Sequence, residues 1–234
     1  MTTTTAVTLA GATGLTGGFS LKSILTSPHA FDLTVLTRRS LSDTPTPINP
    51  STKLTTRLYN DLFTAPTDEH SIAQPGGIYI SCLGTTRAKA GGTAQQEKID
   101  LDLNRDLAAR AKKDGADTMI LVSSGGASAT SRSFYLRIKG QLEEDVKVMG
   151  FGHVVILRPG FLLGERPEKR FFEGLAQPVF RFLGKFSSEA TNVGAAIAYL
   201  AANPPSEKLS VLYDAEIVSC AKQYHEAKAQ SGSK

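Results

Sequence analysis

The sequence contains no tryptophan, only two cysteines (Cys82 and Cys220) and only four histidines. Two cysteines exclude a disulfide framework and a cysteine zinc site, and the scattered histidines lack the spacing of metal ligands. No apolar run reaches the ~18–20 residues that a membrane-spanning helix requires. The N-terminus also shows no targeting pattern. The sequence therefore predicts an intracellular protein without a bound metal.

The chain also has little net charge. Its 26 basic and 22 acidic side chains leave a formal charge of +4, which is too small to indicate nucleic-acid binding. Its 234 residues are 41% hydrophobic and 21% charged, which are ordinary values for a globular protein. We therefore expect one domain over residues 1–234.

Short apolar runs alternate with helical patterns along the chain. We expect strands at residues 6–10, 33–37, 54–59, 77–82, 118–123 and 153–157. Helices are expected from the first glycine cluster to residue 26, at 93–114 and at 134–150. This alternation is typical of a doubly wound α/β fold, whose parallel sheet is covered by helices on both faces.

The first strand leads into a glycine-rich loop, Gly11–Gly17. Gly11 would permit a tight turn, Gly14 a close approach to a pyrophosphate, and Gly17 tight packing of the helix on the strand. The helix that follows would offer free N–H groups to phosphates. The spacing is G-x-x-G-x-x-G rather than the usual G-x-G-x-x-G, and a plain glycine-rich turn is the alternative. The strand–loop–helix context favours dinucleotide binding.

The second strand ends at the basic pair Arg38 and Arg39. An acidic residue in this region would bind the ribose of NAD, whereas arginine suits the 2′-phosphate of NADP(H). The alternative is a solvated basic pair at a strand end. Asp61, after the third strand, is a weaker candidate for contact with adenine. Leu83 and Gly84 follow the fourth strand, where ligands of parallel sheets bind, and would border the cofactor.

Tyr135 and Lys139 lie four residues apart on a predicted helix and so share one face. An ammonium beside a phenol stabilises the phenolate, and such a pair transfers a proton to or from a carbonyl oxygen. Ser123 or Ser124, at the end of the fifth strand, would orient the substrate oxygen. A second Tyr-x-x-x-Lys pair, Tyr224 and Lys228, follows no comparable strand and is interpreted as a surface coincidence near a frayed tail.

These motifs together resemble the atypical branch of the short-chain dehydrogenase/reductase superfamily. The resemblance is closer still to the fungal "found in mitochondrial proteome" proteins and to their animal relative, the Tat-interactive protein oxidoreductase. The resemblance covers about residues 5–170. The residues that carry it are Gly11–Gly17, Arg38-Arg39, residues 82–87, residues 122–127, residues 135–140 and residues 157–160.

The resemblance implies a three-layer Rossmann fold with strand order 3-2-1-4-5-6, bound NADPH, and a small C-terminal cover formed by about residues 160–234. It implies catalytic roles for Tyr135 and Lys139. It places Leu162 at the nicotinamide and Arg170 at the cofactor. The remaining cofactor contacts that it implies are Thr13, Gly14, Leu15, Thr16, Arg38, Arg39, Leu83 and Gly84.

The resemblance also implies a location. Fungal relatives are associated peripherally with the mitochondrial outer membrane, on its cytosolic face, and animal relatives are mainly cytoplasmic and nuclear. The serine of the classical branch is less fixed in this family, so either Ser123 or Ser124 remains a candidate.

Residues 166–186 combine five phenylalanines with five basic side chains and carry +3 of the net charge. Three interpretations compete. The aromatic side chains would pack on the sheet or cover the substrate pocket, or the segment would contact a membrane surface, or it would form a homodimer interface.

We expect an NADPH-dependent reductase that transfers hydride to a small carbonyl substrate. The alternative is an NADPH-binding regulatory or scaffold protein with little turnover. An extended-type epimerase is disfavoured, because only 75 residues follow Pro159, too few for the usual substrate domain.

Overall fold

The computed structural model describes residues 4–41, 44–160 and 190–232. The predicted contacts Leu162 and Arg170 and the basic, phenylalanine-rich residues 166–186 lie outside these ranges.

A single sheet of seven parallel strands forms the centre of the molecule, in the order β3-β2-β1-β4-β5-β6-β7. The predicted Rossmann order is confirmed, and β7 adds a strand at one edge. The strands are β1 (Thr5–Ala10), β2 (Phe31–Thr37), β3 (Lys53–Leu58), β4 (Ile78–Ser81), β5 (Thr118–Val122), β6 (His153–Leu157) and β7 (Leu209–Leu212).

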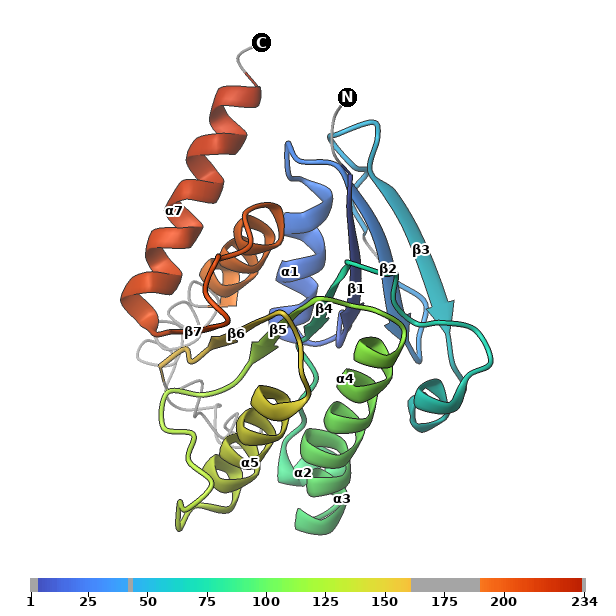
Figure 1. The fold of residues 1–234 in the computed structure, drawn as a ribbon, viewed down its shortest axis with the longest axis vertical. Helices are drawn as coiled ribbons and strands as arrows, with labels where there is room; N and C mark the ends of the chain where they lie inside the picture. Colours follow the sequence, from blue (N-terminus) through green and yellow to red (C-terminus); the bar gives the residue numbers. More distant parts are fainter. Residues whose placement is uncertain (1–3, 42–43, 161–189, 233–234) are drawn as a thin grey trace, which may run out of the picture.

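Helices cover both faces of this sheet (Figure 1). One face carries α1 (Leu15–Leu25), the helical residues 190–202 and α7 (Asp214–Ser231); the other carries α4 (Asn104–Lys113) and α5 (Phe134–Val148). Each layer has its own cluster of buried apolar side chains. The inner strands β4, β5 and β6 are almost wholly buried because helices cover both faces there, as in other doubly wound sheets.

The shorter elements join these layers. A 3-10 helix, η1 (Leu62–Thr67), follows β3, and the short helices α2 (Arg87–Ala90) and α3 (Thr93–Glu97) follow β4. The predicted single helix at 93–114 is interrupted, because η2 (Lys98–Leu103) is a π-helix between α3 and α4. A π-helix turns the side chains that follow it away from the 3.6-residue period, and such bulges are frequent at functional sites.

The C-terminal part differs most from the prediction. Within the predicted cover, 160–234, residues 190–202, β7 and α7 complete the sheet and one helix layer. The interpretation of Tyr224 as a surface residue is wrong, because its side chain is 4% exposed and its hydroxyl donates to the Ser23 carbonyl oxygen at 2.8 Å. The helix also continues to Ser231, so residue 228 does not begin a frayed tail.

Within the described ranges, none of the helices has both the length and the apolarity that crossing a bilayer requires. In the same part of the chain, no group of three or more His, Cys, Asp or Glu side chains could hold a metal ion.

Candidate functional site

The glycine loop joins β1 to α1 with almost no free space. Gly11 has a φ of +90°, and a Cβ on it would lie 2.6 Å from the Cys82 carbonyl carbon. A Cβ on Gly17 would lie 2.1 Å from the Gly11 carbonyl oxygen. The sequence-based roles of Gly11 in the turn and of Gly17 in close packing thus have a direct steric reason.

The N-terminus of α1 is open. Gly14 occupies the N-cap position without a side-chain cap, and its own N–H donates to the Gly11 carbonyl oxygen at 2.9 Å. The first N–H groups of a helix have no partner within it, and the helix dipole makes this end positive. The loop therefore presents N–H groups of Leu15 and Thr16 as an anion-binding surface.

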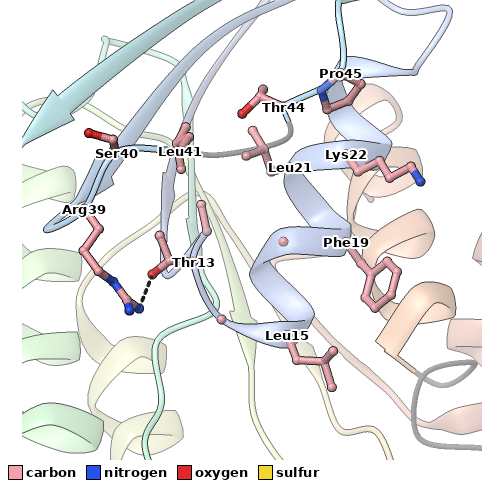
Figure 2. Close-up of a pocket in the computed structure, with 13 residues that line it drawn as sticks. Thr13, Leu15, Phe19, Leu21, Lys22, Arg39, Ser40, Leu41, Thr44 and Pro45 are labelled. Carbon is pink, nitrogen blue, oxygen red and sulfur yellow. Dashed lines mark hydrogen bonds between the residues drawn. The ribbon is translucent and has the colours of Figure 1, made fainter.

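A cavity of about 530 Å³ lies between this loop, α1, residues 39–41 and residues 44–45. Figure 2 shows Arg39 extended toward Thr13, and one guanidinium nitrogen lies 3.4 Å from the Thr13 hydroxyl oxygen. Lys22 from α1 also lines the cavity. Arg39 forms no ion pair with any described residue, so its charge is free to meet an anion.

A second cavity, of about 230 Å³, lies at the carboxyl ends of β4 and β5 and shares Gly14 and Leu15 with the first. It brings together three groups of predicted residues from separate parts of the chain. The lining includes Gly14, Leu15 and Thr16 of the glycine loop, Leu83 and Gly84 after β4, and Ser123, Tyr135 and Lys139. We call this space the catalytic cavity, because it holds the residues that the sequence predicts to be catalytic.

Lys139 lines the catalytic cavity and is otherwise buried, with 4% of its surface exposed. Its Nζ donates to the Val122 carbonyl oxygen at 3.0 Å. Because an ammonium has three donors, this bond fixes the side chain and leaves two N–H groups for other partners. Tyr135, one turn earlier on α5, is half-buried in the same lining.

Asp100, from the π-helix η2, supplies a fully buried carboxyl group to the same lining. Its Oδ1 accepts the Thr85 N–H at 2.7 Å. Burial raises the pKa of Asp100, while the charge of Lys139 and the hydrogen bonds from Thr85 and Gln96 oppose that rise. The Asp100 carboxyl group therefore interacts electrostatically with the buried ammonium of Lys139.

Ser123 lines the catalytic cavity, and its hydroxyl donates to Oε1 of Glu143. Glu143 is fully buried on α5, and its two oxygens also accept from Arg158 Nε at 3.0 Å and Nη2 at 2.5 Å. The hydrogen bond and charge of Glu143 raise the pKa of the Arg158 guanidinium. Arg158 in turn donates to the Tyr213 hydroxyl at 2.9 Å, so the network extends to the start of α7.

Other predicted site residues lie apart from both cavities. Ser124 is buried beside Ser123 but does not line the catalytic cavity. Arg38 is exposed and lines neither cavity. Asp61 caps η1, where its carboxylate accepts the Phe63 N–H at 3.1 Å. Contacts of Arg38 and Asp61 with a cofactor remain predictions.

The sequence-based analysis missed Asp100, Glu143 and Arg158. Glu143 is four residues after Lys139 and eight after Tyr135, so helical spacing alone places it on their face. That signal could have identified it. Asp100 has no such signal, because the π-helix changes the side-chain phase along this segment.

Known proteins support the sequence resemblance. The family described as HIM1 matches residues 71–183. "Protein fmp52, mitochondrial" of Aspergillus fumigatus is 37% identical over 227 residues, which cover 91% of this chain and 96% of that protein. The chain belongs to the FMP52 family. The Candida albicans FMP52 protein is 42% identical over 177 residues, covering 76% of this chain and 74% of its own.

Solved structures share the fold of this FMP52 family member. MoeE5 in complex with UDP-glucose and NAD has a TM-score of 0.59 at 14% identity, over 93% of this chain and 81% of that one. A Bacillus halodurans protein assigned to the NAD-dependent epimerases/dehydratases has a TM-score of 0.60 at 17% identity, over 94% and 99%. At these identities the likeness establishes a Rossmann-like fold alone.

Proposed function

We propose that this protein binds NADPH and reduces a small carbonyl compound by hydride transfer. The observation that carries the proposal is the lining of the catalytic cavity. It joins a phosphate-binding type of loop, the residues after β4, and the Ser123, Tyr135 and Lys139 side chains in one space. The proposed cofactor site and the proposed proton donor would thus be contiguous, as a reductase requires.

The residues present fit a dinucleotide. A Cβ at Gly11 or Gly17 would collide with backbone, so both positions keep the loop tight, and the uncapped N-terminus of α1 faces outward. Thr13, Gly14, Leu15 and Thr16 would hold the pyrophosphate. Leu83 and Gly84 would border the adenosine side.

A preference for NADPH rests on Arg39. Its guanidinium lies in the larger cavity beside Thr13 and has no ion-pair partner among the described residues. A planar guanidinium can bind a phosphate through two parallel hydrogen bonds. Arg38, which is exposed and lines neither cavity, would add charge nearby.

The catalytic roles follow from chemistry and placement. When bound, the nicotinamide supplies the hydride. The Tyr135 hydroxyl would donate a proton to the substrate oxygen, and the Lys139 ammonium would stabilise the phenolate that remains. The bond from Lys139 to Val122 holds the ammonium at the cavity wall, where it would also contact the cofactor ribose.

The family resemblance also supports proposals about where the protein is located and what residues 166–186 contact. The relatives are named mitochondrial, which supports a mitochondrial location for this chain, and we place it at the cytosolic face of the outer membrane. Residues 166–186 would contact the membrane or a second copy of the chain; this segment lies outside the described residues.

The proposal is tested by two measurements on the purified protein. Calorimetric titration with NADPH and NADH should show tighter binding of NADPH. Incubation with NADPH and a panel of aldehydes and ketones should consume the cofactor. Tight NADPH binding without consumption of any panel compound would favour the regulatory alternative.

A further inference from the structure

The direction of one hydrogen bond decides whether the Ser123 hydroxyl can donate to a molecule in the catalytic cavity or only accept from it. The Ser123 hydroxyl donates to Glu143 rather than toward the cavity. A serine hydroxyl has one proton and two acceptor lone pairs. Since its proton is engaged by Glu143, the Ser123 oxygen can only accept a hydrogen bond from a bound molecule.

The surroundings of Glu143 keep the direction of this hydrogen bond fixed. Both of its oxygens accept from Arg158, and the glutamate is fully buried. A carboxylate paired with a guanidinium has no proton to give. The Ser123 hydroxyl therefore cannot reverse its bond, because reversal would leave one lone pair of a buried carboxylate unsatisfied, at a cost of about 1–3 kcal/mol.

The acceptor on Ser123 is also unused. Among the described residues, no donor is directed at its oxygen, although the side chain is only 3% exposed. Ser124 offers no substitute, because it does not line the cavity. A buried acceptor at a cavity wall is satisfied only when a ligand or water donates to it.

We propose that Ser123 selects substrates that carry a hydrogen-bond donor, so that the compound reduced is a carbonyl compound that also bears a hydroxyl group. This inference rests on the proposed reductase function. Tyr135 would donate to the carbonyl oxygen, and the substrate hydroxyl would donate to Ser123. A simple ketone satisfies Tyr135 and leaves Ser123 without a donor, as does a ketone in which the hydroxyl is methylated.

Three ketones of similar size test this. Hydroxyacetone has the donor, 2-butanone replaces the hydroxyl with a methyl group, and methoxyacetone keeps the oxygen without its proton. We expect kcat/KM for hydroxyacetone to exceed that for the other two by up to about tenfold, the value of one neutral hydrogen bond. Ser123→Ala should remove this preference, and Ser124→Ala, at a serine outside the lining, should keep it.

Calorimetry on the NADP-saturated protein gives a second readout that does not depend on turnover. Tighter binding of hydroxyacetone than of methoxyacetone, lost in Ser123→Ala, supports the preference of Ser123 for a hydroxyl donor even when no ketone is reduced; in that case only the proposed reductase function fails. Equal binding, no binding, or a preference for methoxyacetone overturns the inference. Reduction of all three ketones at equal rates overturns it while the proposed function stands.

Discussion

The Nζ atom of Lys139 donates to the carbonyl oxygen of Val122 at 3.0 Å, which ties α5 to the end of β5 at the wall of the catalytic cavity. The lysine is 4% exposed, so its charge acts where little water screens it. This bond explains how one side chain could serve both the cofactor and the proton donor.

Substitutions at Lys139 and Tyr135 should separate these two roles. Lys139→Met removes the ammonium from both, so NADPH affinity and turnover should fall together. Tyr135→Phe removes only the proton donor, so turnover should fall by about 10²–10⁴-fold, the usual contribution of general acid catalysis, while NADPH affinity changes little. Titration measures NADPH affinity, and steady-state kinetics measure turnover. Tyr199→Phe is the control, because Tyr199 lines neither cavity and its hydroxyl donates to Gln223. Equal loss of NADPH affinity in the Lys139 and Tyr135 variants would contradict the division of roles.

The two arginines after β2 should contribute unequally to cofactor choice. Arg39 lines the cavity beside Thr13, whereas Arg38 lines neither cavity. Arg39→Ala should weaken NADPH binding by about tenfold or more, because charge-assisted hydrogen bonds contribute about 1.5–3 kcal/mol. It should leave NADH binding almost unchanged. Arg38→Ala should have a smaller effect in the same titration. An equal loss of both nucleotides in Arg39→Ala would show that no 2′-phosphate is bound there.

Two neighbouring glycines of α1 provide a matched pair. A Cβ on Gly17 would lie 2.1 Å from the Gly11 carbonyl oxygen, but a Cβ on Gly18 would lie at an ordinary 3.5 Å from the Ala12 oxygen. Gly17→Ala should therefore destabilise the fold by about 2–4 kcal/mol, because the added methyl group overpacks the turn, and should abolish NADPH binding. Gly18→Ala should be neutral or stabilise the helix by up to about 1 kcal/mol. Chemical denaturation measures both, and similar losses in the two variants would contradict the packing argument.

The buried ion pair behind Ser123 should dominate local stability. Arg158→Leu leaves the fully buried Glu143 without its partner, and breaking such pairs costs about 3–5 kcal/mol. The more exposed pair of Lys147 and Glu144 is the control, since Lys147→Ala should change the free energy of unfolding by about 1 kcal/mol or less. Comparable losses of stability in the two variants would mean that the buried Glu143–Arg158 pair does not stabilise the fold more than an exposed pair does.

Asp68 should make the protein sensitive to acid. The His70 backbone N–H, the Tyr59 hydroxyl and Arg57 lower the pKa of its carboxyl to about 2, from 3.8. A group whose pKa is lower when folded stabilises the fold above the unfolded value, so this contribution is complete above about pH 4 and is lost as the pH falls toward 2. Melting temperatures of the wild type and Asp68→Asn should differ at neutral pH and converge as the pH falls to about 2. Parallel curves over this range would refute the assignment.

The sequence predicted the site where local rules are strong. Gly11 and Gly17 were identifiable because a strand, a tight turn and a helix impose glycine at fixed positions. Tyr135 and Lys139 were identifiable because four-residue spacing on a helix brings side chains to one face. The strand order followed from the family resemblance, and it is confirmed.

Other features could not be predicted because they depend on tertiary contacts. Ser123 and Ser124 are adjacent and chemically identical, and only the packing of α5 against β5 decides which one lines the cavity. A glutamate such as Glu143 is usually solvated, and its burial is explained by Arg158, which is distant on the chain. The short strand β7 has mixed exposure along its length, and so lacks the continuous apolar run of the inner strands.

We propose that NADPH spans the two adjoining cavities and delivers its hydride to a carbonyl compound in the catalytic cavity. The most direct test uses NADPH deuterated at the transferable position of the nicotinamide ring, with mass spectrometry of the products from an aldehyde and ketone panel that includes hydroxyacetone. The account predicts deuterium on the carbinol carbon of at least one product with the wild-type protein, and its loss with Tyr135→Phe. NADPH binding with no deuterium in any product, or undiminished transfer by Tyr135→Phe, would contradict it.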